Sequence, residues 1–316
     1  MNIASLDIGT NTALLLIANI NNNGINSKNK NTSAGVIKPV INELRMPRLG
    51  KGLSKGGKIS ESSIALLNEA LTEYSRIIES HDCETVLAAG TNALRIASNS
   101  AEVIQRVKDN FGIDIKVIQG KEEARLTFLG ARSSAESDDV ILIDIGGGST
   151  EITIGSSDKI IYSHSFQAGA VTLSEKYITH GIASESELID MSGEIRDIFA
   201  PLETELSSGE IPSETVSAAE AVGVAGTPVS IVSIRLGLMD YDEEKIEGYK
   251  LAYSDVTDIS KTLAATTPED IQQRYGSVLK GREDIIVAGS VILKTILELL
   301  NKNSVTVSTR GLRYGI

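Results

Sequence analysis

The chain contains few of the residues that build disulfides and zinc sites. Its single cysteine, Cys83, cannot form an internal disulfide, and only three histidines accompany it. Structural zinc sites take four cysteine or histidine ligands, so little material is left for one. The composition therefore indicates a reducing compartment and no structural metal.

Long apolar segments are also absent from the sequence. No apolar run approaches the roughly 20 residues that a membrane-spanning helix needs. The first residues, Met-Asn-Ile-Ala-Ser-Leu-Asp, lack the basic region and long apolar stretch of a secretory signal. We expect a soluble cytoplasmic protein without a membrane partner.

Positive charge is scarce, with 30 Lys and Arg against 42 Asp and Glu and a formal net charge of −12. Binding to a nucleic-acid backbone depends largely on cationic contacts, so we expect no nucleic-acid partner. A phosphate-rich ligand would need a local basic site. One Gly-rich segment without acidic residues offers it, and its basic residues are Arg45, Arg48, Lys51, Lys55 and Lys58.

An internal repeat divides this 316-residue chain, whose length already favours two domains. Residues 3–12 are echoed by residues 141–150. Each copy is an apolar strand, then Asp-Ile-Gly with small hydroxyl or amide residues, then a second apolar strand. The pattern predicts one hairpin with a Gly-rich turn in each half.

Hydrophobic periodicity predicts further elements after each hairpin. In the first half we expect a third strand over 36–44, helices over 60–79 and 93–110, and strands over 85–89 and 113–118. In the second half the expected strands are 140–144, 152–155, 160–166 and 218–225, with helices near 122–133, 171–177, 185–199, from 227 and over 284–301, and a last strand over 305–308.

This order favours an α/β protein with two ribonuclease-H-like domains of the actin-like ATPase type and an interdomain cleft. We expect the helix near 122–133 to cross from one domain to the other and the last helix to return the chain to the first domain. The expected N-terminal domain is then 1–124 together with 302–316. The expected C-terminal domain is 125–301.

The Gly-rich turns carry the residues suited to phosphate chemistry. Glycines let a turn expose consecutive N–H groups that bind anions, and the neighbouring hydroxyls and amide can donate to phosphate oxygens. Asp7 and Asp144 stand at strand ends, where they can hold Mg²⁺ or another divalent cation. The turns lack the Gly-Lys-Ser/Thr of a P-loop. The candidate phosphate-binding residues are Gly9, Thr10, Asn11, Thr12, Gly146, Gly147, Gly148, Ser149 and Thr150.

These paired turns resemble the two phosphate loops of the actin, heat-shock ATPase and sugar kinase superfamily. Within it, the sequence resembles the exopolyphosphatase/guanosine pentaphosphate phosphohydrolase family in its short, two-domain form. The matching segments span nearly the whole chain. They are Asp7-Ile-Gly-Thr-Asn-Thr, Arg48-Leu-Gly-Lys-Gly-Leu, Gly90-Thr-Asn-Ala-Leu-Arg-Ile-Ala, Gly120-Lys-Glu-Glu-Ala-Arg-Leu, Asp144-Ile-Gly-Gly-Gly-Ser-Thr-Glu, Ala288-Gly-Ser and Ser308-Thr-Arg-Gly-Leu-Arg.

The resemblance implies roles for individual residues. Glu123 is the residue that activates the attacking water, with Glu122 as the alternative. Neighbours on a helix point about 100° apart, so only one of the two can face a site, and both could instead be surface charges at a helix start. Arg95 would reach the transferring phosphate, Asp144 would act beside the metal, and Arg48 and Lys51 would guide a polyanion.

The resemblance further implies an enzyme, a hydrolase that releases terminal phosphate from inorganic polyphosphate or guanosine pentaphosphate. Both end in a phosphoanhydride, so the motifs leave the choice open. The chain stops before the helical C-terminal domains of long family members, which makes shorter substrates the expectation. A homodimer is expected by analogy with the family. An ATP-dependent kinase or a polyphosphate or alarmone sensor without turnover remain alternatives.

Overall fold

The structure, a computed structural model, describes five stretches of the chain. These are residues 1–21, 36–53, 57–156, 159–178 and 181–316. Residues 21–34 form a segment rich in asparagine, and nearly all of it lies outside the described residues, as does Lys55 of the basic segment. None of the helices in the described stretches combines the length and apolar composition needed to cross a bilayer.

The chain forms two compact units. The first comprises Met1–Gln119 with Ile316, and the second comprises Gly120–Gly315. The boundary thus falls just before the helix that was expected to connect the domains, and the whole of that helix belongs to the second unit.

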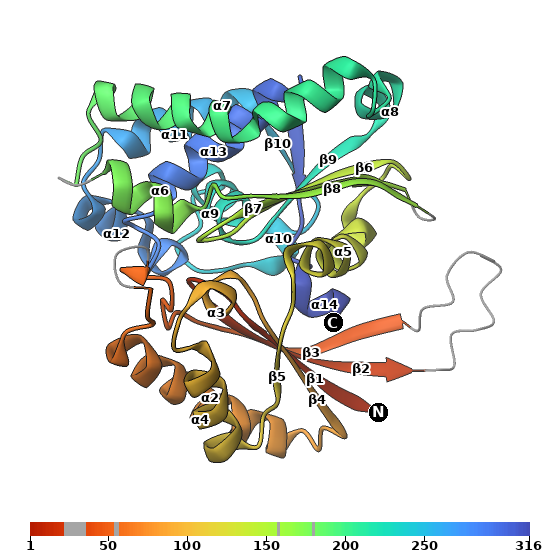
Figure 1. The fold of residues 1–316 in the computed structure, drawn as a ribbon, viewed down its shortest axis with the longest axis vertical. Helices are drawn as coiled ribbons and strands as arrows, with labels where there is room; N and C mark the ends of the chain where they lie inside the picture. Colours follow the sequence, from red (N-terminus) through yellow and green to blue (C-terminus); the bar gives the residue numbers. More distant parts are fainter. Residues whose placement is uncertain (22–35, 54–56, 157–158, 179–180) are drawn as a thin grey trace. The chain divides into compact units, whose positions relative to one another are not determined.

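The first unit is built on a five-stranded sheet in the order β3-β2-β1-β4-β5 (Figure 1). The first three strands pair antiparallel, while β4 and β5 continue the sheet in parallel with β1. The strands are β1 (Asn2–Ile8), β2 (Ala13–Asn21), β3 (Val36–Arg45), β4 (Thr85–Gly90) and β5 (Ile115–Val117). The predicted hairpin and third strand are confirmed.

Helix α2 (Glu61–Ser80) packs against this sheet. Its buried Ile64, Leu67, Leu71 and Tyr74 recur every three or four residues, which is the period of one helix face. The side chain of Ser60 accepts a hydrogen bond from the N–H of Ser63 and caps the first turn. The predicted helix over 60–79 is therefore confirmed.

The expected single helix over 93–110 is wrong, because two helices occupy the segment. They are α3 (Asn92–Ile96) and α4 (Ser100–Phe111). The side chain of Asn99 accepts from the N–H of Ile59 at 2.9 Å and donates to its carbonyl at 3.0 Å. An asparagine that bonds a distant backbone in this way competes with helix formation, which explains the break.

The second unit contains a six-stranded sheet in the order β10-β11-β9-β6-β7-β8. Strands β6, β7 and β8 pair antiparallel, β9 and β11 run parallel to β6, and β10 adds an antiparallel edge. The strands are β6 (Val140–Ile145), β7 (Thr150–Gly155), β8 (Ile160–Phe166), β9 (Glu220–Val224), β10 (Tyr249–Ala252) and β11 (Ser304–Val307).

Helices cover both faces of the second sheet. Strand β6 sends Val140 and Leu142 toward Phe128 of helix α5, while Ile141 and Ile143 join the larger core on the opposite face. That larger core is centred on helix α13 (Ile286–Leu299), which is buried along almost its entire length. The helices of this unit are α5 (Gly120–Ala131), α6 (Ala170–Tyr177), α7 (Glu185–Ser208), α8 (Ser213–Ala218), α9 (Gly226–Arg235), α10 (Glu243–Ile246), α11 (Tyr253–Ala264), α12 (Pro268–Tyr275), α13 and α14 (Leu312–Gly315), with short 3₁₀ turns η2 (Arg132–Ser134) and η3 (Gly276–Leu279).

The C-terminal segment differs from the expectation that 302–316 returns to the first domain. Strand β11 pairs with β9 and β10, and its Val305 and Val307 are buried in the core of the second unit. Only Ile316 groups with the first unit. The two buried valines explain the difference, because the second core cannot release them without losing their apolar burial.

The two sheets share one arrangement. In each, the first three strands along the chain lie side by side in antiparallel order, and two later strands extend the sheet in parallel next to the first strand. Strands β6, β7, β8, β9 and β11 thus repeat strands β1 to β5. The repeat predicted from the two Asp-Ile-Gly segments is confirmed, and the chain has two ribonuclease-H-like domains of the actin-like type.

Candidate active site

In the first unit, the hairpin turn lies against the basic segment. The N–H of Gly9 donates to the carbonyl of Thr12 at 2.8 Å and closes the turn between β1 and β2. The N–H of Gly50 donates to the carbonyl of Thr10 at 2.8 Å, and that of Arg48 to the carbonyl of Asn11 at 3.0 Å. A Cβ at Gly50 would lie 2.1 Å from a methyl carbon of Thr10, so only glycine permits this approach.

The strand-to-helix turn after β4 also lies at this edge of the first sheet. Strands β1 and β4 run parallel, and the N–H of Thr91 donates to the carbonyl of Ile8 at 3.1 Å. Arg95 follows on α3 and donates to the carbonyl of Ile118 at 3.0 Å. The sequence-predicted residues of this unit, Asp7, Gly9, Thr10, Asn11, Thr12, Arg48, Lys51 and Arg95, therefore gather at the carboxyl ends of β1 and β4 or in segments bonded there.

In the second unit, the glycine turn Gly146–Gly148 is closed by the N–H of Gly146, which donates to the carbonyl of Ser149 at 2.9 Å. The start of α6 packs directly on it. The N–H of Val171 donates to the carbonyl of Gly147 at 2.8 Å, and a Cβ at Gly169 would lie 2.3 Å from that same oxygen. This tight packing fixes the shape of the turn.

Thr150 was predicted to contact phosphate, but its side chain is fully buried. Its hydroxyl donates to the carbonyl of Ala168, the residue that precedes the segment packed on the glycine turn. Thr150 thus holds the turn in place, because it starts β7 and points into the protein.

Three carboxylates come together beside the glycine turn, those of Asp144, Glu151 and Glu123. Asp144 on β6 is the cross-strand neighbour of Glu151 on β7, and Glu151 is the cross-strand neighbour of Ser165 on β8. The first residue of α5 packs on that serine, since a Cβ at Gly120 would lie 3.0 Å from the Cβ of Ser165. Helix α5 consequently brings its first turn over Glu151.

Burial and charge act together on Glu151, which is 2% exposed. Burial raises its pKa well above the ordinary value, and the negative charges of Glu123 and Asp144 raise it further. Hydrogen bonds from the hydroxyls of Ser165 and Ser149 oppose the shift only in part. The sequence interpretation had quoted Glu151 as part of a motif without giving it a role. Its signal was the acid that ends the Gly-Gly-Gly-Ser-Thr-Glu segment.

The structure distinguishes the two glutamates at the start of α5. Glu123 is 8% exposed, and its negative charge raises the pKa of Glu151. Glu122 points outward, with its side chain 40% exposed, and forms a two-point ion pair with Arg125 at 2.9 Å. Of the two, Glu123 is the residue at the carboxylate cluster.

The carboxylate cluster suits a hard divalent cation that is bound mainly by substrate and water. Within the described residues, no three Asp, Glu, His or Cys side chains are placed to form a complete metal site. Mg²⁺ commonly uses one or two protein carboxylates and takes its other ligands from phosphate and water. The mutual repulsion that raises the pKa of Glu151 is the kind of repulsion that such a cation relieves.

A half-buried arginine that sequence reasoning missed lies near the same end of the second sheet. Arg282 donates to the hydroxyl of Ser230 at 3.2 Å and to the carbonyl of Gly226 at 3.4 Å, at the turn that follows β9. The register of β6 with β9 places this turn beside Asp144. Burial lowers the pKa of Arg282 to about 10, so the guanidinium keeps its charge at neutral pH. The sequence signal was indirect. It was the Gly226-Thr227 pair at the strand-to-helix turn that Arg282 contacts.

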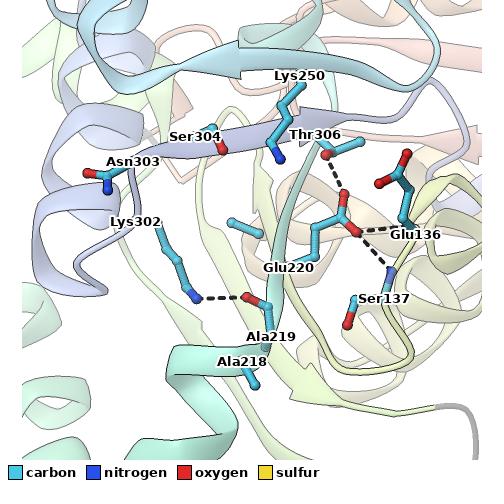
Figure 2. Close-up of a pocket in the computed structure, with 11 residues that line it drawn as sticks. Glu136, Ser137, Ala218, Ala219, Glu220, Lys250, Lys302, Asn303, Ser304 and Thr306 are labelled. Atoms are coloured by element: carbon cyan, nitrogen blue, oxygen red, sulfur yellow. Dashed lines mark hydrogen bonds between the residues drawn. The ribbon is translucent and has the colours of Figure 1, made fainter.

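A pocket of about 440 Å³ occupies the other end of this sheet (Figure 2). Its polar groups are largely engaged within the protein. Glu220 accepts from the hydroxyl of Thr306 and from the N–H groups of Glu136 and Ser137, while Lys302 donates to the carbonyls of Ser217 and Ala219. The glycine turn lies at the carboxyl end of β6 and this pocket at the amino ends of the strands, so the pocket is separate from the carboxylate cluster.

Comparisons with known proteins agree with this architecture. A sequence model of the Ppx/GppA phosphatase family matches residues 27–316. A bifunctional 3-dehydroquinate synthase/phosphatase of Fusobacterium nucleatum is 31% identical over 96% of the chain, which spans only 44% of that relative. Exopolyphosphatase 2 of Mycobacterium tuberculosis is 28% identical over 99% of the chain and 97% of its own length.

A crystal structure of an exopolyphosphatase from Cytophaga hutchinsonii matches the fold over 100% of this chain and 96% of its own. Its TM-score is 0.86 at 28% sequence identity. The family match covers all of the second unit and most of the first, including every motif from Arg48 onward. The chain belongs to the Ppx/GppA phosphatase family.

Proposed function

We propose that the protein is a phosphohydrolase that releases the terminal phosphate of inorganic polyphosphate. The observation that carries this proposal is the buried Glu123, which stands beside Glu151 and Asp144 next to a glycine turn. Membership of a phosphatase family and similarity to exopolyphosphatases support the substrate class.

In this proposal Glu123 accepts a proton from a water molecule. The water oxygen forms a bond to the terminal phosphorus, and the bond from that phosphorus to the bridging oxygen breaks. The products are inorganic phosphate and a polyphosphate one phosphate shorter. Phosphoryl transfer depends mainly on positioning and charge neutralisation, so a carboxylate base with anion-binding groups is a sufficient set.

In each unit the backbone N–H groups of the glycine turn would bind phosphate oxygens, together with neighbouring side chains. These are Thr10, Asn11 and Thr12 in the first unit and Ser149 in the second. Arg95 would contact the transferring phosphate, and Arg282 adds a half-buried cation in the second unit. Arg48 and Lys51 would attract the remaining phosphates of the polyphosphate. Thr150 contributes by holding the second turn.

In the second unit Asp144 would hold Mg²⁺, with Glu151 as a further carboxylate next to it, and in the first unit Asp7 is the candidate metal ligand. When bound, the cation would neutralise charge on the phosphate oxygens and so favour attack by water. The proposal assigns proton acceptance to Glu123 and phosphate binding to the turns.

The test is release of inorganic phosphate in the presence of Mg²⁺ from three substrates side by side: short polyphosphate, long polyphosphate and guanosine pentaphosphate. We expect release from polyphosphate. A preference for the nucleotide would make the protein an alarmone phosphatase. Binding without release from any of the three would overturn the hydrolase proposal in favour of a sensor.

A further inference from the structure

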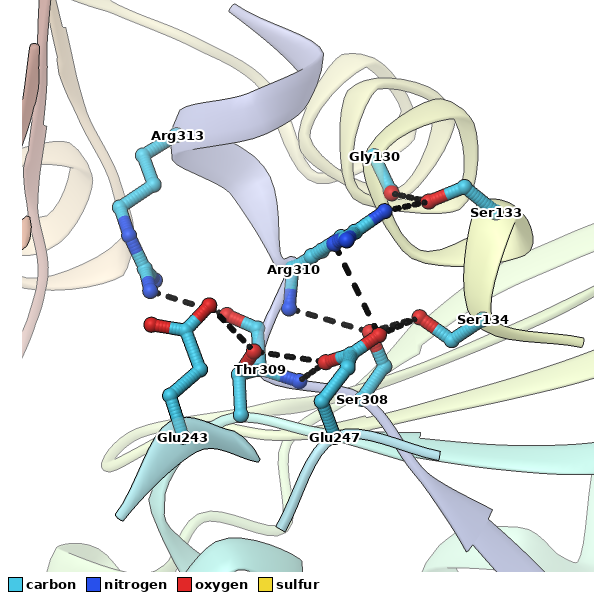
Figure 3. A network of polar contacts seen from close by, with 9 residues as sticks. All are labelled: Gly130, Ser133, Ser134, Glu243, Glu247, Ser308, Thr309, Arg310 and Arg313. Carbon is cyan, nitrogen blue, oxygen red and sulfur yellow. Dashed lines mark hydrogen bonds and ion pairs between the residues drawn. The ribbon is translucent and has the colours of Figure 1, made fainter. Parts of the chain in front are cut away.

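A polar network in the second unit centres on the carboxylate of Glu247 (Figure 3). One oxygen, Oε2, accepts from the N–H of Thr309 at 2.7 Å and from its hydroxyl at 2.6 Å. The other, Oε1, accepts from the hydroxyl of Ser134 and lies 3.7 Å from Nε of Arg310. One side chain therefore joins the segment that follows β11 to the end of the helix α5 and η2 segment.

The same two segments are joined by further contacts. The hydroxyls of Ser134 and Ser308 are 2.7 Å apart, and Arg310 donates to the hydroxyl of Ser133 at 3.1 Å. Ser133 in turn donates to the carbonyl of Gly130 in the last turn of α5. The network is thus anchored in α5 itself and not only in the turn that follows it.

Helix α14 continues this contact along α5 with the two backbones touching. A Cβ at Gly315 would lie 1.9 Å from the carbonyl oxygen of Leu126, and one at Gly130 would lie 2.5 Å from the carbonyl oxygen of Gly311. Because no side chain separates the helices, a shift of the C-terminal segment is passed directly to α5.

Helix α5 carries Glu123 in its first turn. A helix moves nearly as a rigid rod over so short a length, so the orientation of its carboxyl end determines where the first turn lies. We propose that Glu247 is a positioning residue, which holds the C-terminal segment against α5 and thereby fixes Glu123 beside Glu151.

This inference rests on the proposed role of Glu123, so its test has one arm that does not require activity. In the full-length protein, hydrogen exchange of residues 120–134 is compared among wild type, Glu247→Ala and Glu247→Gln. Glu244→Ala is the matched control, since Glu244 is an exposed glutamate on α10 near Glu247 in sequence. We expect exchange in this stretch to rise by roughly tenfold or more in Glu247→Ala, because several hydrogen bonds to one carboxylate are lost.

The glutamine variant keeps one acceptor oxygen, so we expect an intermediate effect, and Glu244→Ala should match wild type. The second arm is phosphate release. We expect kcat of Glu247→Ala to fall on the order of 10-fold to 100-fold with KM within about twofold, as misplacement of a catalytic group produces.

Three results would overturn the inference: unchanged exchange in α5, exchange that rises equally throughout the protein, or a changed α5 with unchanged kcat. If wild type releases no phosphate from any substrate, the proposed function fails instead. The exchange arm then decides by itself whether Glu247 holds α5.

Discussion

Glu123 on helix α5 and Glu151 on strand β7 form a close pair of carboxylates in the second unit. Burial raises the pKa of Glu151, and the charge of Glu123 adds to that shift. Two carboxyl groups held together in a buried place destabilise the folded protein, and such arrangements are typical of functional sites. The pair is therefore the feature of the second unit that most directly indicates chemistry.

The backbone contact between α5 and α14 predicts an asymmetric effect of two alanine substitutions. Gly315→Ala would place a Cβ 1.9 Å from the carbonyl oxygen of Leu126, so the helices must separate. We expect the free energy of unfolding to fall by about 1–3 kcal/mol, as overpacking does. Chemical denaturation measures it.

Gly311→Ala is the matched control for that experiment. It lies just before α14, has nothing within 4 Å of its Cβ position, and should stay within about 0.5 kcal/mol of wild type. Equal stabilities for the two variants would contradict the described packing of α14 on α5.

Glu220 predicts a pH-dependent contribution to stability. Burial alone would raise its pKa, but hydrogen bonds from Thr306 and from the N–H groups of Ser137 and Glu136 lower it below the ordinary value of 4.5. A carboxyl whose folded pKa is lowered stabilises the fold above pH 4.5 and loses that contribution as pH falls through the folded pKa. Glu220→Gln should thus cost on the order of 1 kcal/mol at pH 7.

The difference between Glu220→Gln and wild type should shrink as the pH is lowered from about 5 toward 3. Urea denaturation across this range measures it, with Glu214→Gln as the exposed control on α8. A difference that stayed constant with pH would show that Glu220 acts through packing instead of charge.

Arg282 predicts an effect on substrate binding. Replacing it with methionine removes a half-buried positive charge near the carboxyl end of β9 while keeping much of the side-chain volume. If Arg282 contacts phosphate, KM for polyphosphate should rise by roughly tenfold, the usual loss for a charge-assisted hydrogen bond.

Arg274→Met on the exposed face of α12 provides the comparison for Arg282→Met. A thermal melt of both variants separates loss of binding from loss of folding. An unchanged KM in a folded Arg282→Met protein would remove Arg282 from the proposed site.

Local sequence patterns predicted most of the fold. Alternating apolar residues beside Asp-Ile-Gly turns identified both hairpins, and the spacing of Ile64, Leu67, Leu71 and Tyr74 identified α2. Breaks caused by long-range contacts were not visible. Asn99 lies at the break between α3 and α4 and bonds Ile59, and nothing in the surrounding sequence reveals that partner.

The candidate site was predictable where a motif carried it and not where the fold assembles it. Glu123 and the glycine turns stand in recognisable segments, but the outward ion pair of Glu122 with Arg125 becomes evident only in the structure. Glu151 and Arg282 depend on strand register and helix packing, and Glu247 gains its partners from segments distant in the sequence. The prediction that 302–316 returns to the first domain was wrong, because by composition its valines fit either core.

The most direct test of the central claim compares Glu123→Gln with Glu122→Gln. Both substitutions remove one carboxylate from the first turn of α5, and they differ in that only Glu123 is buried at the carboxylate cluster. Phosphate release from short polyphosphate is measured with Mg²⁺, and binding of the same substrate is measured separately. We expect Glu123→Gln to lose activity by a factor of roughly 10² to 10⁴ while still binding, as loss of a general base does, and Glu122→Gln to remain close to wild type. Undiminished release by Glu123→Gln would contradict the account.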